Sequence, residues 1–162
     1  MIDQTTKSPD SPHDSGAPIR LGPSELAAWQ GFLRAHQSLI RELDRELVAE
    51  HRLSLTGHDV LVNLIEAEGG EMRMAELADA VLLSRSGLTR LVERLVLEGL
   101  VERRRCESDA RGFFAVLTSV GATRLAEARP THRAGVRRLF TGRFTEAELE
   151  QMAGFWARVH DG

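Results

Sequence analysis

The change from a helical to an extended hydrophobic pattern within residues 74–118 constrains the fold of this chain more than any other feature. A compact helix is predicted over residues 75–81, and a tight turn follows at 82–84. A second helix is predicted over residues 84–98, and Gly99 ends it. Its apolar residues recur at helical spacing on one side: Leu88, Leu91, Val92, Leu95 and Val96.

Alternating residues after Gly99 predict a β-hairpin. Strands are expected over residues 100–106 and 113–118, on either side of a polar tip at 107–112. A helix, a turn, a helix and a two-stranded ribbon, in this order, are the parts of a winged helix-turn-helix. In such a module the second helix enters the major groove of DNA, and the first braces it across the backbone. The sequence therefore predicts a mostly α-helical protein with a small β-hairpin that reads DNA.

The second helix of this module is predicted to carry the residues that recognise DNA. Arg90 is the favoured base reader, because a guanidinium can bond guanine N7 and O6 together. The alternative is that this polar side is only the solvated face of an amphipathic helix, but the flanking turn and hairpin favour DNA. The predicted recognition set consists of Ser84, Arg85, Ser86, Thr89, Arg90 and Arg94.

The hairpin tip is the more specific signal. Asp109 and Arg111 lie two residues apart, so that the acid can orient the guanidinium for a narrow minor groove. Arg103, Arg104 and Arg105 alternate faces of a strand and cannot all face DNA. At least one of the three is expected to belong to a charged, solvated strand edge. We assign Arg103, Arg105, Asp109 and Arg111 to the wing.

Four further helices are predicted around this module. Ser24 is expected to cap a long first helix, and Thr56 a second one that stops at Gly69-Gly70. Thr118 is expected to cap a helix that Pro130 kinks or interrupts. The first helix carries a broad apolar seam, made of Leu26, Trp29, Leu33, His36, Ile40, Leu43 and Leu47. We interpret it as burial against both its own domain and a partner chain; the alternative is an ordinary core stripe within one monomer. The last helix opens with a Thr145–Glu148 capping box and is expected to bury Leu149, Met152, Phe155, Trp156 and Val159.

The composition and the motifs of the sequence argue against catalysis. The net charge is −3, but residues 82–112 are locally rich in arginine. The histidines form no HxxxH pair, and Gly69-Gly70 has no context for a phosphate loop, so no enzyme, metal site or cofactor is predicted. The polar stretch over residues 1–22 is expected to be a disordered tail. The chain has no apolar run long enough for a membrane span. Its single cysteine, Cys106, together with the absence of a signal sequence, favours a reducing cytoplasm.

The sequence resembles the MarR (multiple antibiotic resistance regulator) family of transcription factors. The resemblance is specific around MAELADAVLLSRSGLTRLVERLVLEGLVERR and extends through the spaced residues Leu100-Val101, Arg103, Asp109, Arg111, Leu117-Thr118 and Gly121. It implies a MarR-type domain over 23–162, with dimerisation helices at 23–50 and 119–160 and a winged helix-turn-helix lobe at 54–118.

The resemblance also implies a function. Family members commonly release DNA when a small aromatic or lipophilic molecule binds a cleft between the dimer helices and the winged lobe. By analogy Trp29, Phe32, His36 and His58 would line it, although core packing is the alternative for each. We therefore expect a homodimeric repressor of a near-palindromic double-stranded operator. The alternative is a winged-helix adaptor or antirepressor that contacts proteins and does not bind DNA.

Overall fold

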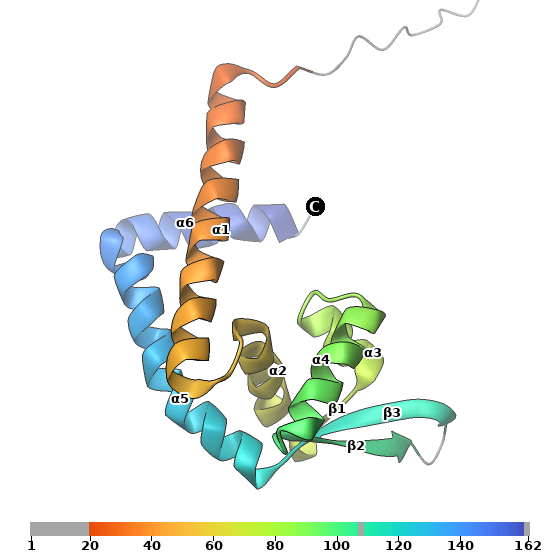
Figure 1. The fold of residues 1–162 in the computed structure, drawn as a ribbon. Coiled ribbons are helices and arrows are strands. Elements are labelled where there is room, and N and C mark those ends of the chain that lie inside the picture. Colours follow the sequence, from red (N-terminus) through yellow and green to blue (C-terminus); the bar gives the residue numbers. More distant parts are fainter. Residues whose placement is uncertain (1–19, 107–108, 161–162) are drawn as a thin grey trace, which may run out of the picture. The chain divides into compact units, whose positions relative to one another are not determined.

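The computed structural model describes residues 20–106 and 109–160, and the side chains of 109–111 and 160 lie outside its described part. The chain divides into two compact units, Met1–Arg34 and Ala35–Gly162. Its helices and strands, labelled in Figure 1, are α1 (Pro23–His51), α2 (Leu55–Glu66), β1 (Glu71–Arg73), α3 (Met74–Ala80), α4 (Arg85–Leu97), β2 (Val101–Cys106), β3 (Asp109–Leu117), α5 (Ser119–Leu139) and α6 (Glu146–His160), with short 3-10 helices η1 (Glu68–Gly70) and η2 (Thr141–Arg143).

The architecture is the predicted one, a mostly helical chain with a helix-turn-helix and a β-ribbon. The sheet, however, has three strands in the order β1-β3-β2, and the sequence predicted only two. The missed strand β1 pairs antiparallel with β3, placing Met72 opposite Ala115. Three residues are too few to show an alternating pattern, so its pairing depends on a segment more than forty residues away. The third strand fixes the base of the ribbon beside α3 and α4 (Figure 1).

The end of α4 follows its local sequence. The Leu100 amide donates to the Leu95 carbonyl at 2.9 Å, and the Gly99 amide donates to the Val96 carbonyl at 2.9 Å. This pair of bonds is the Schellman motif, which needs the left-handed φ of 71° that Gly99 adopts. Leu100 is fully buried, which gives the apolar contact that commonly accompanies this motif. The motif therefore turns the chain directly from α4 into β2.

Two helix starts differ from the predictions. Ser54, rather than Thr56, caps α2, because its Oγ accepts from the Gly57 amide at 3.1 Å. Asp44 of α1 accepts from the Leu55 amide at 2.8 Å, which satisfies a second exposed amide of that helix end. In α1 the helix already begins at Pro23, one residue before the predicted cap. Proline is favoured in a first helical turn, since the amide it lacks would have no helical partner there.

The helix α5 runs without interruption through Pro130, so the interruption, one of the two predicted effects of this proline, does not occur. Its start is as predicted, because Thr118 Oγ1 accepts from the Gly121 amide at 3.0 Å. Packing on both sides of the proline holds the helix together. Leu125 and Ala128 are fully buried before it, and Gly135 is buried after it against α1.

The hydrophobic core lies in the lobe formed by α2, α3, α4 and the sheet. One contiguous cluster joins these elements to the end of α1 and the start of α5. Its largest fully buried side chains are Leu47, Leu53, Leu61, Leu64, Leu77, Leu88, Leu95, Leu100 and Leu125. Because this cluster encloses one side of α4, it sets the direction in which the polar side of α4 points.

The last helix keeps its predicted start but not its predicted burial. Glu148 Oε2 accepts from the Thr145 amide at 2.8 Å, and Thr145 Oγ1 accepts from the Glu148 amide at 3.4 Å, which is the capping box. Along α6, however, Phe155 is 51% exposed and Val159 is 71% exposed. An apolar face that the periodicity assigned to a core is thus open to solvent in the single chain.

The junction between β3 and α5 generates a stability prediction. A Cβ atom added at Gly121 would lie 2.1 Å from the Leu100 carbonyl oxygen and 2.9 Å from Leu117 Cδ1. Gly121→Ala should therefore lower the free energy of unfolding by about 1–3 kcal/mol, the usual cost of forcing atoms into a packed site. Urea unfolding measures this change. The exposed Thr123→Ala on the same helix should stay within about 0.5 kcal/mol of wild type, and equal stability of both variants would contradict the close approach.

Candidate nucleic-acid interface

The turn before α4 determines where this helix begins. Leu82 adopts a φ of 54°, in the left-handed region that a leucine rarely enters. Ser84 then caps α4 by accepting from the Gly87 amide at 3.1 Å. On the inner side of α4, Leu88, Val92 and Leu95 are at most 1% exposed. The opposite side of the helix must therefore face solvent.

The predicted recognition residues lie on this outer side. Ser84, Arg85, Ser86, Arg90 and Arg94 are exposed, and Thr89 is half-buried. Not all of them are available in the same way. The Ser84 hydroxyl serves the helix cap, and the Thr89 hydroxyl donates to the Arg85 carbonyl at 2.9 Å. Arg85 and Arg90 remain the guanidinium groups best placed to extend from α4.

Arg94 has a partner that the sequence did not predict. Its Nη2 donates to Ser54 Oγ at 3.1 Å, across to the start of α2. Forty residues separate the two groups along the chain. Helical spacing puts Arg94 on the same side of α4 as Arg90, but it cannot indicate a contact with a residue so distant in the sequence.

The wing separates its three consecutive arginines onto two faces. Arg104 forms an ion pair with Glu71 of β1 and lies over the Phe114 ring at 5.4 Å. Arg103 and Arg105 lie on the other face, 4.5 and 5.9 Å from the centroid of the Phe113 ring. The three arginines thus alternate faces of the strand, as predicted, and Arg104 is paired within the sheet.

The sequence alone assigned no role to Phe113 and Phe114, which lie against the arginines of the wing. In the strand register Phe113 lies opposite Arg105, and Phe114 lies opposite Arg104. An aromatic face attracts a guanidinium, and at exposed sites such a contact contributes about 0.5–1 kcal/mol. Phe113 thus limits the conformations open to two arginines at once. The alternation of strand residues could have given this pairing, had the register of the hairpin been known.

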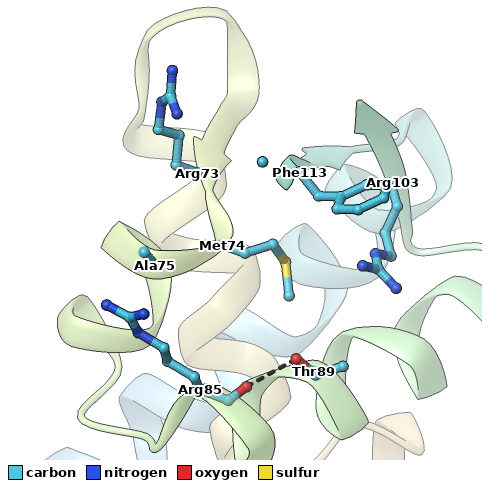
Figure 2. Close-up of a pocket in the computed structure, with 8 residues that line it drawn as sticks. Arg73, Met74, Ala75, Arg85, Thr89, Arg103 and Phe113 are labelled. Carbon is cyan, nitrogen blue, oxygen red and sulfur yellow. Dashed lines mark hydrogen bonds between the residues drawn. The ribbon is translucent and has the colours of Figure 1, made fainter. Parts of the chain in front are cut away.

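A cleft of about 380 Å³ connects the wing with the helix-turn-helix. Figure 2 shows α3, α4 and the ribbon each contributing to its wall, with Arg85 and Thr89 on one side and Arg103 and Phe113 on the other. Arg103 also lies 3.9 Å from Glu93, which ties the wing to α4. The cleft is lined by Arg73, Met74, Ala75, Arg85, Thr89, Arg103, Gly112 and Phe113. Three of these residues are arginines, and none is acidic.

The remaining predicted site residues are distributed as follows. Asp109 and Arg111 lie in β3, which begins four residues earlier than predicted. Their side chains lie outside the described part of the structure. Trp29 and Phe32 belong to the other compact unit, and His36 is exposed on α1. His58 of the predicted effector cleft lines a pocket.

That pocket lies between α2 and α5 and measures about 390 Å³. His58 is only 3% exposed, and its Nε2 has no hydrogen-bond partner. Its ring lies 4.4 Å from that of His132, centroid to centroid. Burial lowers the pKa of His132 below its ordinary value of 6.5, and the neighbouring His58 lowers it further. The lining also contains two arginines and two carboxylates: Arg129, Arg133, Asp59 and Glu66.

Neither a metal site nor a membrane-spanning helix is found in the part of the chain that the structure describes. Among these residues, no group of three or more His, Cys, Asp or Glu side chains is arranged to hold a metal ion. No described helix combines the length and the apolar character needed to cross a bilayer.

A helix-turn-helix with an arginine-bearing outer face, joined by a basic cleft to a β-wing, defines a winged-helix protein of the DNA-binding class. The MarR family model matches residues 53–112. AbsC, a MarR family transcriptional regulator from Streptomyces coelicolor, is 34% identical, with 88% of this chain and 96% of that chain covered and a TM-score of 0.82.

Sco3205, a MarR family transcriptional regulator from the same organism solved in complex with DNA, is 32% identical, with 91% and 92% of the two chains covered and a TM-score of 0.85. A mutant MarR from E. coli complexed with operator DNA shares the fold at 22% identity, over 87% and 99% of the chains, with a TM-score of 0.75. No curated protein sequence matches this chain. The chain belongs to the MarR family of transcriptional regulators.

The His58–His132 contact generates a prediction for pH. Because the folded protein disfavours a proton on His132, the unfolded chain binds more protons near pH 6.5 and below. The free energy of unfolding should therefore fall as the pH drops through 6.5. His132→Gln should reduce the difference in melting temperature between pH 7.5 and pH 5.5, measured by circular dichroism. Between pH 7.5 and pH 8.5, where the ring is neutral in both states, the two proteins should respond alike; an unchanged acid response would contradict the prediction.

Proposed function

We propose that this MarR family regulator binds a near-palindromic double-stranded operator as a homodimer, with α4 in the major groove and the β2–β3 wing in the adjoining minor groove. One observation carries the proposal: Arg85 and Thr89 of α4 and Arg103 of the wing line the same basic cleft. Two DNA-facing elements must share one side of the molecule to reach neighbouring grooves. A cleft without acidic lining residues favours an anionic partner such as the phosphate backbone.

Within this arrangement the residues divide by task. Arg90 and Arg85 extend from the exposed side of α4 and would bond base edges in the major groove. Arg103 and Arg105, held against Phe113, would contact phosphates beside the groove. Asp109 and Arg111, near the tip of the ribbon, would enter the narrow minor groove. The DNA complex reported for Sco3205 supports DNA as the partner of this fold.

The homodimer is supported by apolar surfaces that the single chain leaves open. Ile40 of α1 is 42% exposed, and on α6 the side chains of Phe155 and Val159 are largely exposed. Apolar side chains left exposed on helices in this way are typical of contacts with another protein chain. We assign residues 23–50 and 119–160 to dimerisation and residues 54–118 to DNA binding. Two copies related by a two-fold axis match the symmetry of a near-palindromic operator.

The regulatory outcome that we propose is repression, by occupying a promoter, in the cytoplasm where the operator is found. A small aromatic or lipophilic effector would release the protein from DNA. The pocket at His58, between the lobe and α5, is the described cavity best placed for such an effect. A protein that acts in this way does so by binding and needs no catalytic group. A winged-helix adaptor for proteins has no corresponding need for a basic cleft.

The DNA-binding assignment is tested by two substitutions. Arg90→Ala should cost about 1–3 kcal/mol of binding free energy and relax base preference, because one base-reading guanidinium is lost from each protomer. Arg111→Ala should lower affinity on many sequences. Duplexes selected from a random library, followed by gel-shift titration over a salt series, measure both effects. Affinity that does not fall with salt, or equal binding by the wild type and both variants, would remove the assignment.

The dimer is tested by a charge on the exposed face of α6. Phe155→Glu should shift the protein from dimer to monomer, because a carboxylate buried in an apolar interface loses its hydration. Sedimentation velocity at micromolar concentration measures the mass. Glu150→Gln, an exposed change on the same helix, serves as the control and should leave the dimer intact. A Phe155→Glu protein that remains dimeric would exclude this face from the interface.

A further inference from the structure

The three arginines on the outer side of α4 do not have equivalent surroundings. Arg94 is the one whose guanidinium crosses to another helix, where its Nη2 donates to Ser54 Oγ at 3.1 Å. The same oxygen accepts from the Gly57 amide at 3.1 Å. A serine hydroxyl has two lone pairs and one proton. With both lone pairs occupied, Ser54 can only donate, and the remaining N–H groups of Arg94 can also only donate.

The surroundings of this pair add further donors. A cleft of about 280 Å³ beside it is lined by Thr56, Leu83, Gly87, Arg90, Leu91 and Arg94. None of these six residues is acidic, and the polar side chains among them are two guanidinium groups and one hydroxyl. A cluster with donors in excess is matched by a ligand with several acceptor oxygens and a negative charge. In a duplex this ligand is the phosphate backbone, because the phosphates carry the negative charge and base edges carry none.

The position of Arg94 along α4 also favours a phosphate contact over a base contact. Base edges are contacted by the N-terminal residues of a recognition helix, and Arg94 lies in the last turn of α4. A rise of about 1.5 Å per residue puts it roughly 6 Å further along the helix axis than Arg90. It is directed toward the start of α2, whose cap residue holds it. Helical spacing alone had placed Arg94 among the recognition residues without a separate task.

We propose that Arg94 and Ser54 form a phosphate-binding pair that positions α4 on the duplex, and that Arg94 does not read bases. This inference rests on the proposed function and divides the α4 arginines into base readers, Arg85 and Arg90, and a positioning residue, Arg94. A guanidinium already oriented by Ser54 loses little further freedom when it binds a phosphate oxygen. The pair thereby sets the register in which Arg90 meets a base.

The test compares Arg94→Ala with Arg90→Ala in the full-length protein. Each variant is titrated against a duplex selected by the wild type and against a scrambled duplex, at several salt concentrations. Arg94→Ala should weaken binding to both duplexes by a similar factor, roughly tenfold. If each dimer loses two phosphate contacts, the slope of log affinity against log salt should fall by about 1.8. The base profile selected by Arg94→Ala should match that of the wild type, whereas the Arg90→Ala profile should be relaxed.

Further variants separate folding and general charge from the specific contact. Arg20→Ala removes an equal charge from an exposed position that precedes α1 and lies outside the residues assigned to dimerisation and DNA binding, and it should keep the wild-type affinity and slope. Ser54→Asn retains a good helix cap but changes the partner of Arg94, and should produce a smaller loss of the same kind on both duplexes. Thermal unfolding of each variant checks that α2 and α4 remain folded.

Two outcomes would overturn the inference. One is an altered base profile for Arg94→Ala with the loss confined to the selected duplex. The other is unchanged affinity on both duplexes. Either result leaves the proposed function standing, because the wild type would still bind DNA in a salt-dependent way. If the wild type itself binds neither duplex, the proposed function fails, and the phosphate-binding pair fails with it.

Discussion

The burial of the apolar side of α4 is the constraint on which the rest of the site depends. Leu88, Val92 and Leu95 are enclosed by the core of the lobe, so α4 cannot rotate about its axis without exposing them. An arginine cannot enter that core without losing its hydration. The same packing that stabilises the lobe therefore presents Arg85 and Arg90 outward. Stability and the DNA recognition that we propose use opposite sides of one helix.

The β-wing also uses its two faces for different tasks. Successive residues of a strand face opposite sides of the sheet, so three consecutive arginines are divided between a structural face and a cleft face. Arg104 is paired with Glu71 of the edge strand β1, whereas Phe113 keeps Arg103 and Arg105 on the side of α4. Both aromatic residues that follow the wing arginine thus have a physical role. They orient guanidinium groups before DNA arrives.

The lobe is joined to α5 at two places with different chemistry. At the junction with β3, Thr118 Oγ1 donates to the Gly99 carbonyl at 2.7 Å and caps α5, and Gly121 lies directly against the Leu100 backbone. Further along, His58 of α2 lies against His132 of α5. The first contact is fixed by close packing, whereas the second contains groups that can bind a proton. A change in how α2 meets α5 would therefore move the DNA-binding lobe relative to the helix that we assign to dimerisation.

The sequence alone determined the order of helices, turn and ribbon. It also determined the capping of α5 by Thr118, the capping box at Thr145 and Glu148, and the end of α4 at Gly99. Each of these local features depends on residues within a few positions of one another. Contacts across the fold decided the rest. β1 became a strand only by pairing with β3, Pro130 stayed helical because buried residues hold both sides of it, and Arg94 acquired Ser54 as a partner forty residues away. Helical or strand periodicity gives the side on which a residue lies, but only tertiary packing determines which group meets it there.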